Sequence, residues 1–553
     1  MVDMVSCDTL AMTPDSATAA TATALEMVWW GWGIDARHEP LSASAQAMLG
    51  KMLDLDDRPR TVPKMPTPAP IRLQTDDIAV LASIVGTGNI ASDDISRVAH
   101  CRGKSTTDLL RIRGGDVADA PDAVVLPTSH DEILAVLKAC AARGIAVVPF
   151  GGGTSVVGGL VAEPTAFAGV IALDLRRLDE LVAVDDVSMT ATFQPGVRGP
   201  RAEALLAEHG LTLGHFPQSF EHASLGGFAA TRSSGQASGG YGRFDEMVVG
   251  LTIATPTGSW RLGRGPANAA GPDLRQLVLG SEGAFGVITE LVVAVHRAPA
   301  VRRYNGWQVV SFGAGLDVLR TLAQRDMLPT IARLSDEIET AAGLANATET
   351  GTQTSAGCYL VVGFEGDADE VAARERAVSA DLSTAGARPL GGEFGSRWQQ
   401  GRFHAPYLRD ALLDIGGLVE TVETTTSWSN IPALYRAVRK ATVDSLGGAG
   451  AAVIVLCHVS HVYRTGASLY FTVICKQNDD PVDQWNTAKV AITDAIVAAG
   501  GSVTHHHGVG TVHRRWLTEE IGGVGVRVLA AVKHELDPTG ILNPGVLVPR
   551  GDE

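Results

Sequence analysis

Residues 149–160, Pro-Phe-Gly-Gly-Gly-Thr-Ser-Val-Val-Gly-Gly-Leu, constrain this chain most, because they place five glycines in one turn. The apolar run before them, residues 145–148, predicts a short buried strand. Glycine lets successive backbone N–H groups converge on an anion, and Thr154 and Ser155 add hydroxyl donors. The run lacks both the Gly-Lys-Ser/Thr ending of a P-loop and a helix after G-x-G-x-x-G. We therefore expect a loop that holds a pyrophosphate; the alternative is a flexible glycine loop.

Three further blocks follow in order, at residues 217–235, 279–289 and 536–545. Together with the glycine run they resemble the p-cresol methylhydroxylase/vanillyl-alcohol oxidase superfamily of FAD-binding proteins. The resemblance implies an α+β fold with a two-subdomain FAD-binding domain and a separate α/β cap domain for the substrate. It also implies that the C-terminal segment returns to the flavin domain.

The same resemblance implies which residues surround the FAD. In relatives the glycine loop wraps the pyrophosphate, and the next two blocks run beside the phosphates and the flavin ring. Residues 151–160 contain no His, Cys or Tyr that could attach to the ring, so we expect non-covalent FAD. The expected cofactor-binding residues are Pro149, Phe150, Gly151, Gly152, Gly153, Thr154, Ser155, Gln218, Ser219, Phe220, Glu221, His222, Ala223, Ser224, Thr231, Arg232, Ser233, Ser234, Gly280, Ser281, Glu282, Gly283, Ala284, Phe285 and Gly286.

A second constellation is His505-His506-His507, followed by Gly-Val-Gly. Neighbours on an extended segment alternate in direction, so we expect His506 to point away from His505 and His507. Three consecutive histidines are therefore not an obvious three-ligand metal site, and we expect no metal. Histidine titrates near neutrality and suits proton transfer.

This histidine motif resembles one branch of the superfamily, the alkyldihydroxyacetonephosphate synthases, and so does Gly-Ala-x-x-Tyr-Phe at residues 466–471. By that resemblance Tyr470 is the proton donor and acceptor, and the three histidines share the catalytic role. Arg409 would bind the substrate phosphate, and Arg333 would be a further catalytic arginine. The alternatives are a core tyrosine at position 470 and surface salt bridges for the two arginines.

Two departures from the synthase pattern stand out. The eukaryotic members of the branch have Asp-Ser where this chain has Gln218-Ser219, and His458 and His461 are additional imidazoles. Glu423 lies in a segment that resembles the branch, but the sequence assigns it no role.

Composition narrows the class of protein. The net charge is −16 without a long Lys/Arg run, which argues against general nucleic-acid binding. The six scattered cysteines fit a reducing compartment, and no apolar run is long enough to span a membrane. The first 36 residues contain no Lys or Arg, unlike a targeting signal. We expect a cytoplasmic homodimer with a lipid-like small-molecule substrate, and loose peripheral attachment to a membrane stays open.

Periodicity and composition divide the chain into segments. We expect helices over residues 76–85, 130–142 and 517–536, with Ser129 as an N-cap. The predicted segments are a disordered extension (1–26), an N-terminal helical arm (27–115), the FAD-binding domain (116–298), the cap domain (299–500) and a C-terminal segment that completes the active site (501–553).

The branch implies a reaction: exchange of the acyl group of 1-acyl-dihydroxyacetone phosphate for a fatty alcohol, a step in ether-lipid synthesis. The alternative is an FAD-dependent dehydrogenase or oxidase of a 2-hydroxy acid or lipid-like alcohol. A third reading, a flavin-binding scaffold without catalysis, is disfavoured by the histidines and Tyr470.

Overall fold

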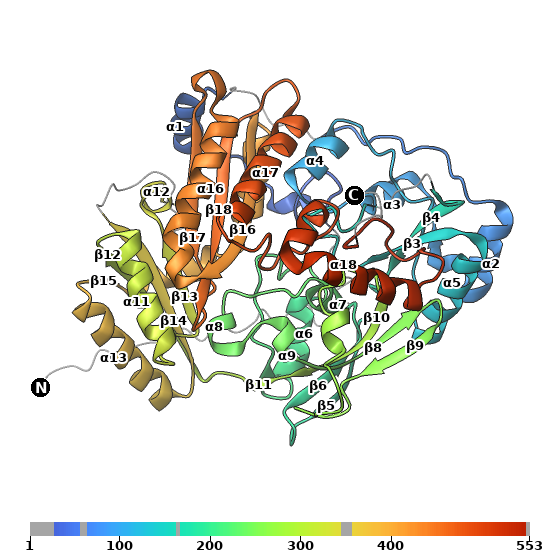
Figure 1. The fold of residues 1–553 in the computed structure, drawn as a ribbon, viewed down its shortest axis with the longest axis horizontal. Coiled ribbons are helices and arrows are strands. Elements are labelled where there is room, and N and C mark those ends of the chain that lie inside the picture. The colour runs from blue at the N-terminus through green and yellow to red at the C-terminus, as the bar shows by residue number, and fades with distance from the viewer. Residues whose placement is uncertain (1–26, 56–62, 162–165, 344–356, 549–553) are drawn as a thin grey trace, which may run out of the picture.

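The computed structural model describes residues 27–55, 63–161, 166–343 and 357–548. Its elements form three main sheets with helices packed on them (Figure 1). The predicted disordered extension, residues 1–26, lies outside the described residues.

The first sheet has four strands in the order β1 (Ile90–Ala91), β2 (Ala123–Val125), β4 (Gly169–Asp174) and β3 (Ile145–Phe150). The last three are parallel, and β3 leads directly into the glycine run. Helices α2 (Thr75–Val85) and α5 (His130–Arg143) bury their apolar faces against this sheet. Ser129 caps α5 by accepting from the Glu132 N–H, as predicted.

The second sheet is antiparallel, in the order β5 (Leu181–Asp185), β6 (Thr190–Phe193), β10 (Val287–Ala294), β8 (Val248–Thr255) and β9 (Gly258–Leu262). Helices α6 (Gly199–Ala207), α7 (Leu225–Ala230) and α9 (Phe244–Met247) pack in its core. These two sheets are the two subdomains that the resemblance implies.

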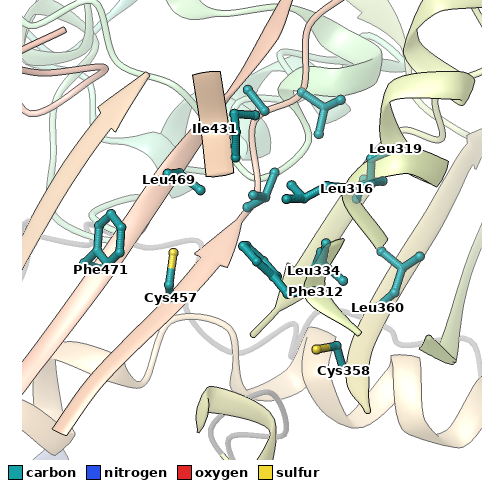
Figure 2. Close-up of a cluster of buried hydrophobic side chains, with 14 of the residues drawn as sticks. Phe312, Leu316, Leu319, Leu334, Cys358, Leu360, Ile431, Cys457, Leu469 and Phe471 are labelled. Atoms are coloured by element: carbon teal, nitrogen blue, oxygen red, sulfur yellow. The ribbon is translucent and has the colours of Figure 1, made fainter. Parts of the chain in front are cut away.

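The third sheet belongs to the predicted cap, in the order β15 (Arg388–Gly391), β12 (Val301–Val309), β14 (Cys358–Gly366), β13 (Ile331–Ser335), β17 (Val453–Val459), β18 (Gly466–Lys476) and β16 (Gly417–Ser427). One face is covered by α11 (Phe312–Gln324), α13 (Ala368–Thr384), α16 (Ile431–Leu446) and α17 (Pro481–Ala498). Figure 2 shows this core, where Leu316 and Leu319 of α11 lie near Leu334 and Leu360 of the strands. Because strand side chains alternate, the opposite face of β16, β17 and β18 is free to line a cavity.

The C-terminal segment returns to the flavin side. Helix α18 (Leu517–Leu536), shown in red in Figure 1, has the predicted end residues but is interrupted by a kink at Gly522. Lys533 of α18 donates to Ala284 O at 2.9 Å, and beyond the helix the backbone of Asn543 donates to Val147 O of β3 at 2.8 Å. The α+β fold with a C-terminal return is therefore confirmed.

The N-terminal arm contains α1 (Ala43–Leu53), α3 (Asp94–Ala99) and α4 (Thr106–Arg113) besides α2. Trp30 and Trp32 are buried, which agrees with a packed arm. In the described ranges, no helix is long and apolar enough to cross a membrane. The shorter elements are β7 (Leu211–Thr212), α8 (Ser238–Tyr241), α10 (Arg275–Val278), β11 (His296–Arg297), α12 (Glu337–Ala341), α14 (Gly392–Gly401) and α15 (Ala405–Leu413).

Candidate active site

A cavity of about 800 Å³ lies where the arm, the glycine run, the cap strands and the histidine segment meet. Most of the residues predicted from sequence line it. They are Pro149, Phe150, Gly151, Gly152, Gly153, Thr154, Ser155, Gln218, Ser219, Ala223, Ser224, Thr231, Ser233, Ser234, Glu282, Gly283, Gly286, Arg333, Arg409, Tyr470, His506 and His507.

Several predicted residues surround the cavity without lining it. Of these, His505 faces Tyr463 and Arg243, and Glu221 pairs with Arg37 at 2.6 Å. Arg232 pairs with Asp245 at 3.0 Å. The remainder are Phe220, His222, Gly280, Ser281, Ala284 and Phe285.

The glycine run fits tightly against the second block. A Cβ on Gly152 would lie 2.3 Å from the His222 carbonyl oxygen, and one on Gly151 would lie 2.5 Å from Ser224 Oγ. Gly153 has a φ of +67°, a conformation that favours glycine. The backbone of the glycine run therefore packs so closely against the second block that no side chain fits at Gly151 or Gly152.

These residues fit an FAD. Gln218 Nε2 is buried in the cavity wall, and no described residue accepts from it. Such an orphaned polar atom beside a glycine cradle is what a bound dinucleotide would satisfy. The glycine run and the block at 217–235 would hold the FAD, which supplies an electron-accepting and electron-donating ring when bound.

Tyr470 of β18 stands at the centre of the catalytic groups. Its ring stacks on His458 and His506, with ring centroids 4.9 and 6.0 Å apart, and meets His507 edge-on at 5.6 Å. Burial raises the pKa of Tyr470 to about 12, so its phenol keeps its proton at neutral pH. Tyr470 lines the cavity from the face of the sheet opposite the main core, which disfavours the alternative of a core tyrosine.

The three histidines are held by Glu423 of β16. Its buried carboxylate accepts from the backbone N–H groups of His505, His506 and His507 at 2.6, 3.2 and 3.0 Å. Burial raises the pKa of Glu423, but the adjacent histidines and the Thr504 hydroxyl outweigh burial and hold that pKa well below its usual range.

This arrangement corrects the predicted orientation. The histidine segment is not extended, because three successive N–H groups curl around one carboxylate. His506 and His507 both reach the cavity, and it is His505 that turns away. The expected inequivalence of the three residues holds, but the expected pairing of His505 with His507 is wrong.

A second buried carboxylate holds the rest of the loop. Glu282 of the third flavin block accepts from the N–H groups of Val509 and Gly510 at 2.9 and 2.8 Å. Burial raises the pKa of Glu282 to about 7, and the two N–H donors offset only part of that effect. One cap carboxylate and one flavin-domain carboxylate thus fix five backbone N–H groups of residues 505–510.

Four arginines line the cavity, and Arg37 is the one already described as paired with Glu221; the others are Arg333, Arg402 and Arg409. Arg333 pairs with Glu339 at 2.5 Å, and Arg409 pairs with Asp410 at 2.9 Å. The pairs are internal rather than surface bridges.

Two of these guanidinium groups keep buried donors without acceptors. Among the residues described, no acceptor satisfies Arg333 Nε, or Arg402 Nε and Nη1, whereas Arg409 Nη2 lies 2.9 Å from Asp410 Oδ1. Such donors suit an anionic group of a ligand.

A group with metal-ligand spacing also occurs here. Ring nitrogens of His461, His505 and His506 lie within 4.8 Å of one another. The argument against a metal from alternating side chains on an extended strand therefore does not apply, because this segment is curled. A positive guanidinium, Arg243 Nη1, lies 3.1 Å from His505 Nε2 and opposes binding of a cation there. The absence of a metal stays a prediction.

Sequence reasoning missed several contributors. Glu423 and Glu282 act through backbone contacts 82 and 227 residues away in the chain, which no local motif signals. Arg402, Arg243 and Tyr463 belong to no block that was singled out. Trp32 of the arm also lines the cavity, although the sequence assigned the arm no part in the site.

Two family models and one solved structure establish the class of protein to which this chain belongs. Residues 121–262 match the family model described as "FAD binding domain", and residues 298–547 match "FAD linked oxidases, C-terminal domain". The solved structure of p-cresol methylhydroxylase shares the fold, with a TM-score of 0.66 over 88% of this chain and 99% of that chain at 15% identity. The chain is an FAD-binding flavoprotein of this superfamily.

The branch follows from nearer relatives. The alkyldihydroxyacetonephosphate synthase of Dictyostelium discoideum is 35% identical over 83% of this chain and 78% of its own length. A solved alkyldihydroxyacetonephosphate synthase superposes with a TM-score of 0.81 at 30% identity, covering 94% of this chain and 98% of that chain. The chain belongs to the alkyldihydroxyacetonephosphate synthase family.

Proposed function

We propose that the protein is an FAD-dependent alkyldihydroxyacetonephosphate synthase, which exchanges the acyl chain of 1-acyl-dihydroxyacetone phosphate for a fatty alcohol. The observation that carries the proposal is a single cavity that joins an FAD cradle, unsatisfied arginine donors, a proton-transfer cluster and an apolar wall. Family membership supports the same activity.

The arginines supply the phosphate end of the site. Arg409 donates from Nη1 to the Lys104 carbonyl, and its Nη2 pairs with Asp410 Oδ1 at 2.9 Å, so two internal contacts hold its positive charge at the cavity wall. Arg402 lies over the rings of Phe216 and Phe403, at 4.9 Å from each centroid, and offers a second fork of donors. We assign phosphate binding to Arg409, with Arg402 as the second candidate, and place Arg333 near Tyr470.

Part of the cavity wall is apolar and suits an alkyl chain. Leucines and other apolar side chains from α1, α15 and the cap strands pack together there and line the cavity wall. A substrate with a charged head and a long hydrocarbon tail matches this division. The lining apolar residues are Leu41, Ala45, Leu408, Leu412, Val419, Leu456 and Ile474.

The protein's own groups handle the protons. Tyr470 keeps its hydroxyl proton near neutrality and can donate it to a leaving oxygen or accept one in return. Burial lowers the pKa of His507 to about 3, so its imidazole is neutral near pH 7 and its unprotonated nitrogen can accept a hydrogen bond from the alcohol. Arg333, held by Glu339 and His458, keeps positive charge next to this exchange.

The test is incubation of the purified flavoprotein with 1-acyl-dihydroxyacetone phosphate and a long-chain alcohol. Chromatography should show an ether product and free fatty acid, and neither should form without the alcohol. An enzyme that instead reduces a dye with a 2-hydroxy acid or lipid-like alcohol, without an ether product, would be the oxidoreductase alternative, which the FAD linked oxidase match supports.

We also propose a cytoplasmic homodimer that attaches loosely to a membrane surface. In the part of the chain described, Cys101, Cys140, Cys358, Cys457 and Cys475 are buried free thiols, which fits a reducing compartment. Exposed Ile521, Val524 and Val528 of α18 supply apolar surface for association.

A further inference from the structure

His505 lies between a permanent cation and the second histidine. Its Nε2 is 3.1 Å from Arg243 Nη1 and 2.6 Å from the Tyr463 hydroxyl, and its Nδ1 is 2.9 Å from His506 Nδ1. Arg243 also donates from Nη2 to the His505 carbonyl at 3.3 Å, and its Nε pairs with Asp245 at 3.0 Å. The guanidinium is therefore fixed from both sides.

The direction of each hydrogen bond follows from Arg243. A guanidinium only donates, so His505 Nε2 must be an acceptor, and the Tyr463 hydroxyl can donate to the same nitrogen. A neutral imidazole with an acceptor Nε2 carries its hydrogen on Nδ1. Within the described part of the chain, the partner of that hydrogen is His506 Nδ1 at 2.9 Å, which leaves the hydrogen of neutral His506 on Nε2. The Glu423 carboxylate lies 3.7 Å from His506 Nδ1, beyond hydrogen-bond distance.

Burial agrees with neutral rings. The pKa of His505 lies well below its usual range, and that of His506 is lowered, in both cases chiefly by burial. A protonated His505 would direct an N–H at the guanidinium, which repulsion disfavours.

We infer that Arg243, Tyr463 and His505 are positioning residues that fix the tautomer of His506, so that its Nε2 carries the exchangeable hydrogen in the cavity beside Tyr470. This inference rests on the proposed exchange reaction for its kinetic consequences, but the tautomer itself does not depend on any substrate. The sequence assigns His505 a direct catalytic role, whereas here it acts through His506.

The decisive measurement is ¹⁵N NMR of the FAD-loaded protein with labelled histidine, with the His506 signals assigned from the His506→Gln spectrum. We expect hydrogen on His506 Nε2 and none on Nδ1. A wild-type spectrum with hydrogen on Nδ1 would overturn the inference.

Two variants of His505 whose new side chains are isosteric with each other test the effect of the tautomer on kcat. His505→Asn keeps an N–H donor near the position of Nδ1, so we expect kcat within about tenfold of wild type. His505→Asp offers only acceptors, should move the His506 hydrogen to Nδ1, and should lower kcat by about 100-fold or more with little change in KM. A purely structural role predicts equal losses in the two variants, and that result would refute the inference.

A tyrosine pair supplies the control. Tyr463→Phe removes one donor to His505 Nε2 while Arg243 remains, so we expect a kcat loss of about tenfold. Tyr304→Phe removes a buried hydroxyl that bonds Glu365 in the cap sheet and should stay within twofold of wild type, about the scatter of such assays. If the wild-type protein shows the expected His506 tautomer by NMR but no exchange activity, the proposed function is refuted and the inference about the tautomer stands.

Discussion

The Glu423 carboxylate accepts the backbone N–H of His505 at 2.6 Å, although the two residues belong to different segments 82 positions apart. The contact, with its two neighbours at His506 and His507, sets where the imidazoles point. The orientation of the catalytic histidines therefore depends on Glu423, a residue that does not itself line the cavity.

Glu423→Gln should lower the exchange rate by about 100-fold, because the amide NH₂ repels N–H donors and the histidine loop loses its curl. FAD content should persist, since the glycine cradle lies elsewhere. Steady-state rates and flavin absorbance provide the measurement. Glu365→Gln is the matched control, a carboxylate of the cap sheet that bonds Tyr241 and Tyr304 instead. Equal losses in the two variants would contradict the assigned role.

Tyr470→Phe should reduce the rate by about 100-fold or more while the protein keeps its FAD and melting temperature. With a pKa of about 12, the phenol contributes no ionisation limb to the pH–rate profile below about pH 10. Tyr435→Phe, whose hydroxyl bonds Asp336 at 2.8 Å, is the control. Full activity of Tyr470→Phe would remove the tyrosine from the mechanism.

Gly152→Ala should abolish FAD binding, since the new Cβ would lie 2.3 Å from the His222 carbonyl oxygen. Gly265→Ala meets nothing within 4 Å and should bind normally. Flavin released by acid from the purified variants measures occupancy, and colour left in the wild-type pellet would refute non-covalent binding.

Parts of this architecture were predictable and parts were not. Ser129 was predicted correctly as an N-cap, because capping is a local signal. The end residues of α18 were also predicted correctly, but the kink at Gly522 was not. The predicted orientation of His506 was wrong, because a distant carboxylate, not local backbone preference, sets the course of that loop. Glu282 was assigned to FAD for its position in a flavin block; it lines the cavity, and its Oε2 also accepts from the histidine loop, a contact that the sequence did not predict.

Glu282 should also make stability depend on pH. Its pKa is about 7 in the fold and near 4.5 in the unfolded chain, so the contribution it makes to stability is present below pH 4.5 and lost as the pH rises through 7. The free energy of unfolding of wild type should therefore fall relative to Glu282→Gln between pH 5 and 8. Denaturant titrations at the two pH values measure the difference, and a parallel response would show that Glu282 titrates normally.

Arg409→Gln should raise KM for the phosphate substrate by about 10- to 100-fold with a smaller effect on kcat, because a neutral amide replaces the charged fork. Arg388→Gln, an exposed arginine of β15 that bonds Gln308, is the control. If KM responds to Arg402→Gln but not to Arg409→Gln, the phosphate lies at Arg402.

The central claim is exchange without net oxidation, and an anaerobic stoichiometry tests it most directly. With 1-acyl-dihydroxyacetone phosphate, a long-chain alcohol and a redox dye present together, each fatty acid released should match one ether product, and the dye should remain oxidised. Dye reduction in proportion to substrate consumed, without ether formation, would contradict the account and identify the protein as an oxidoreductase.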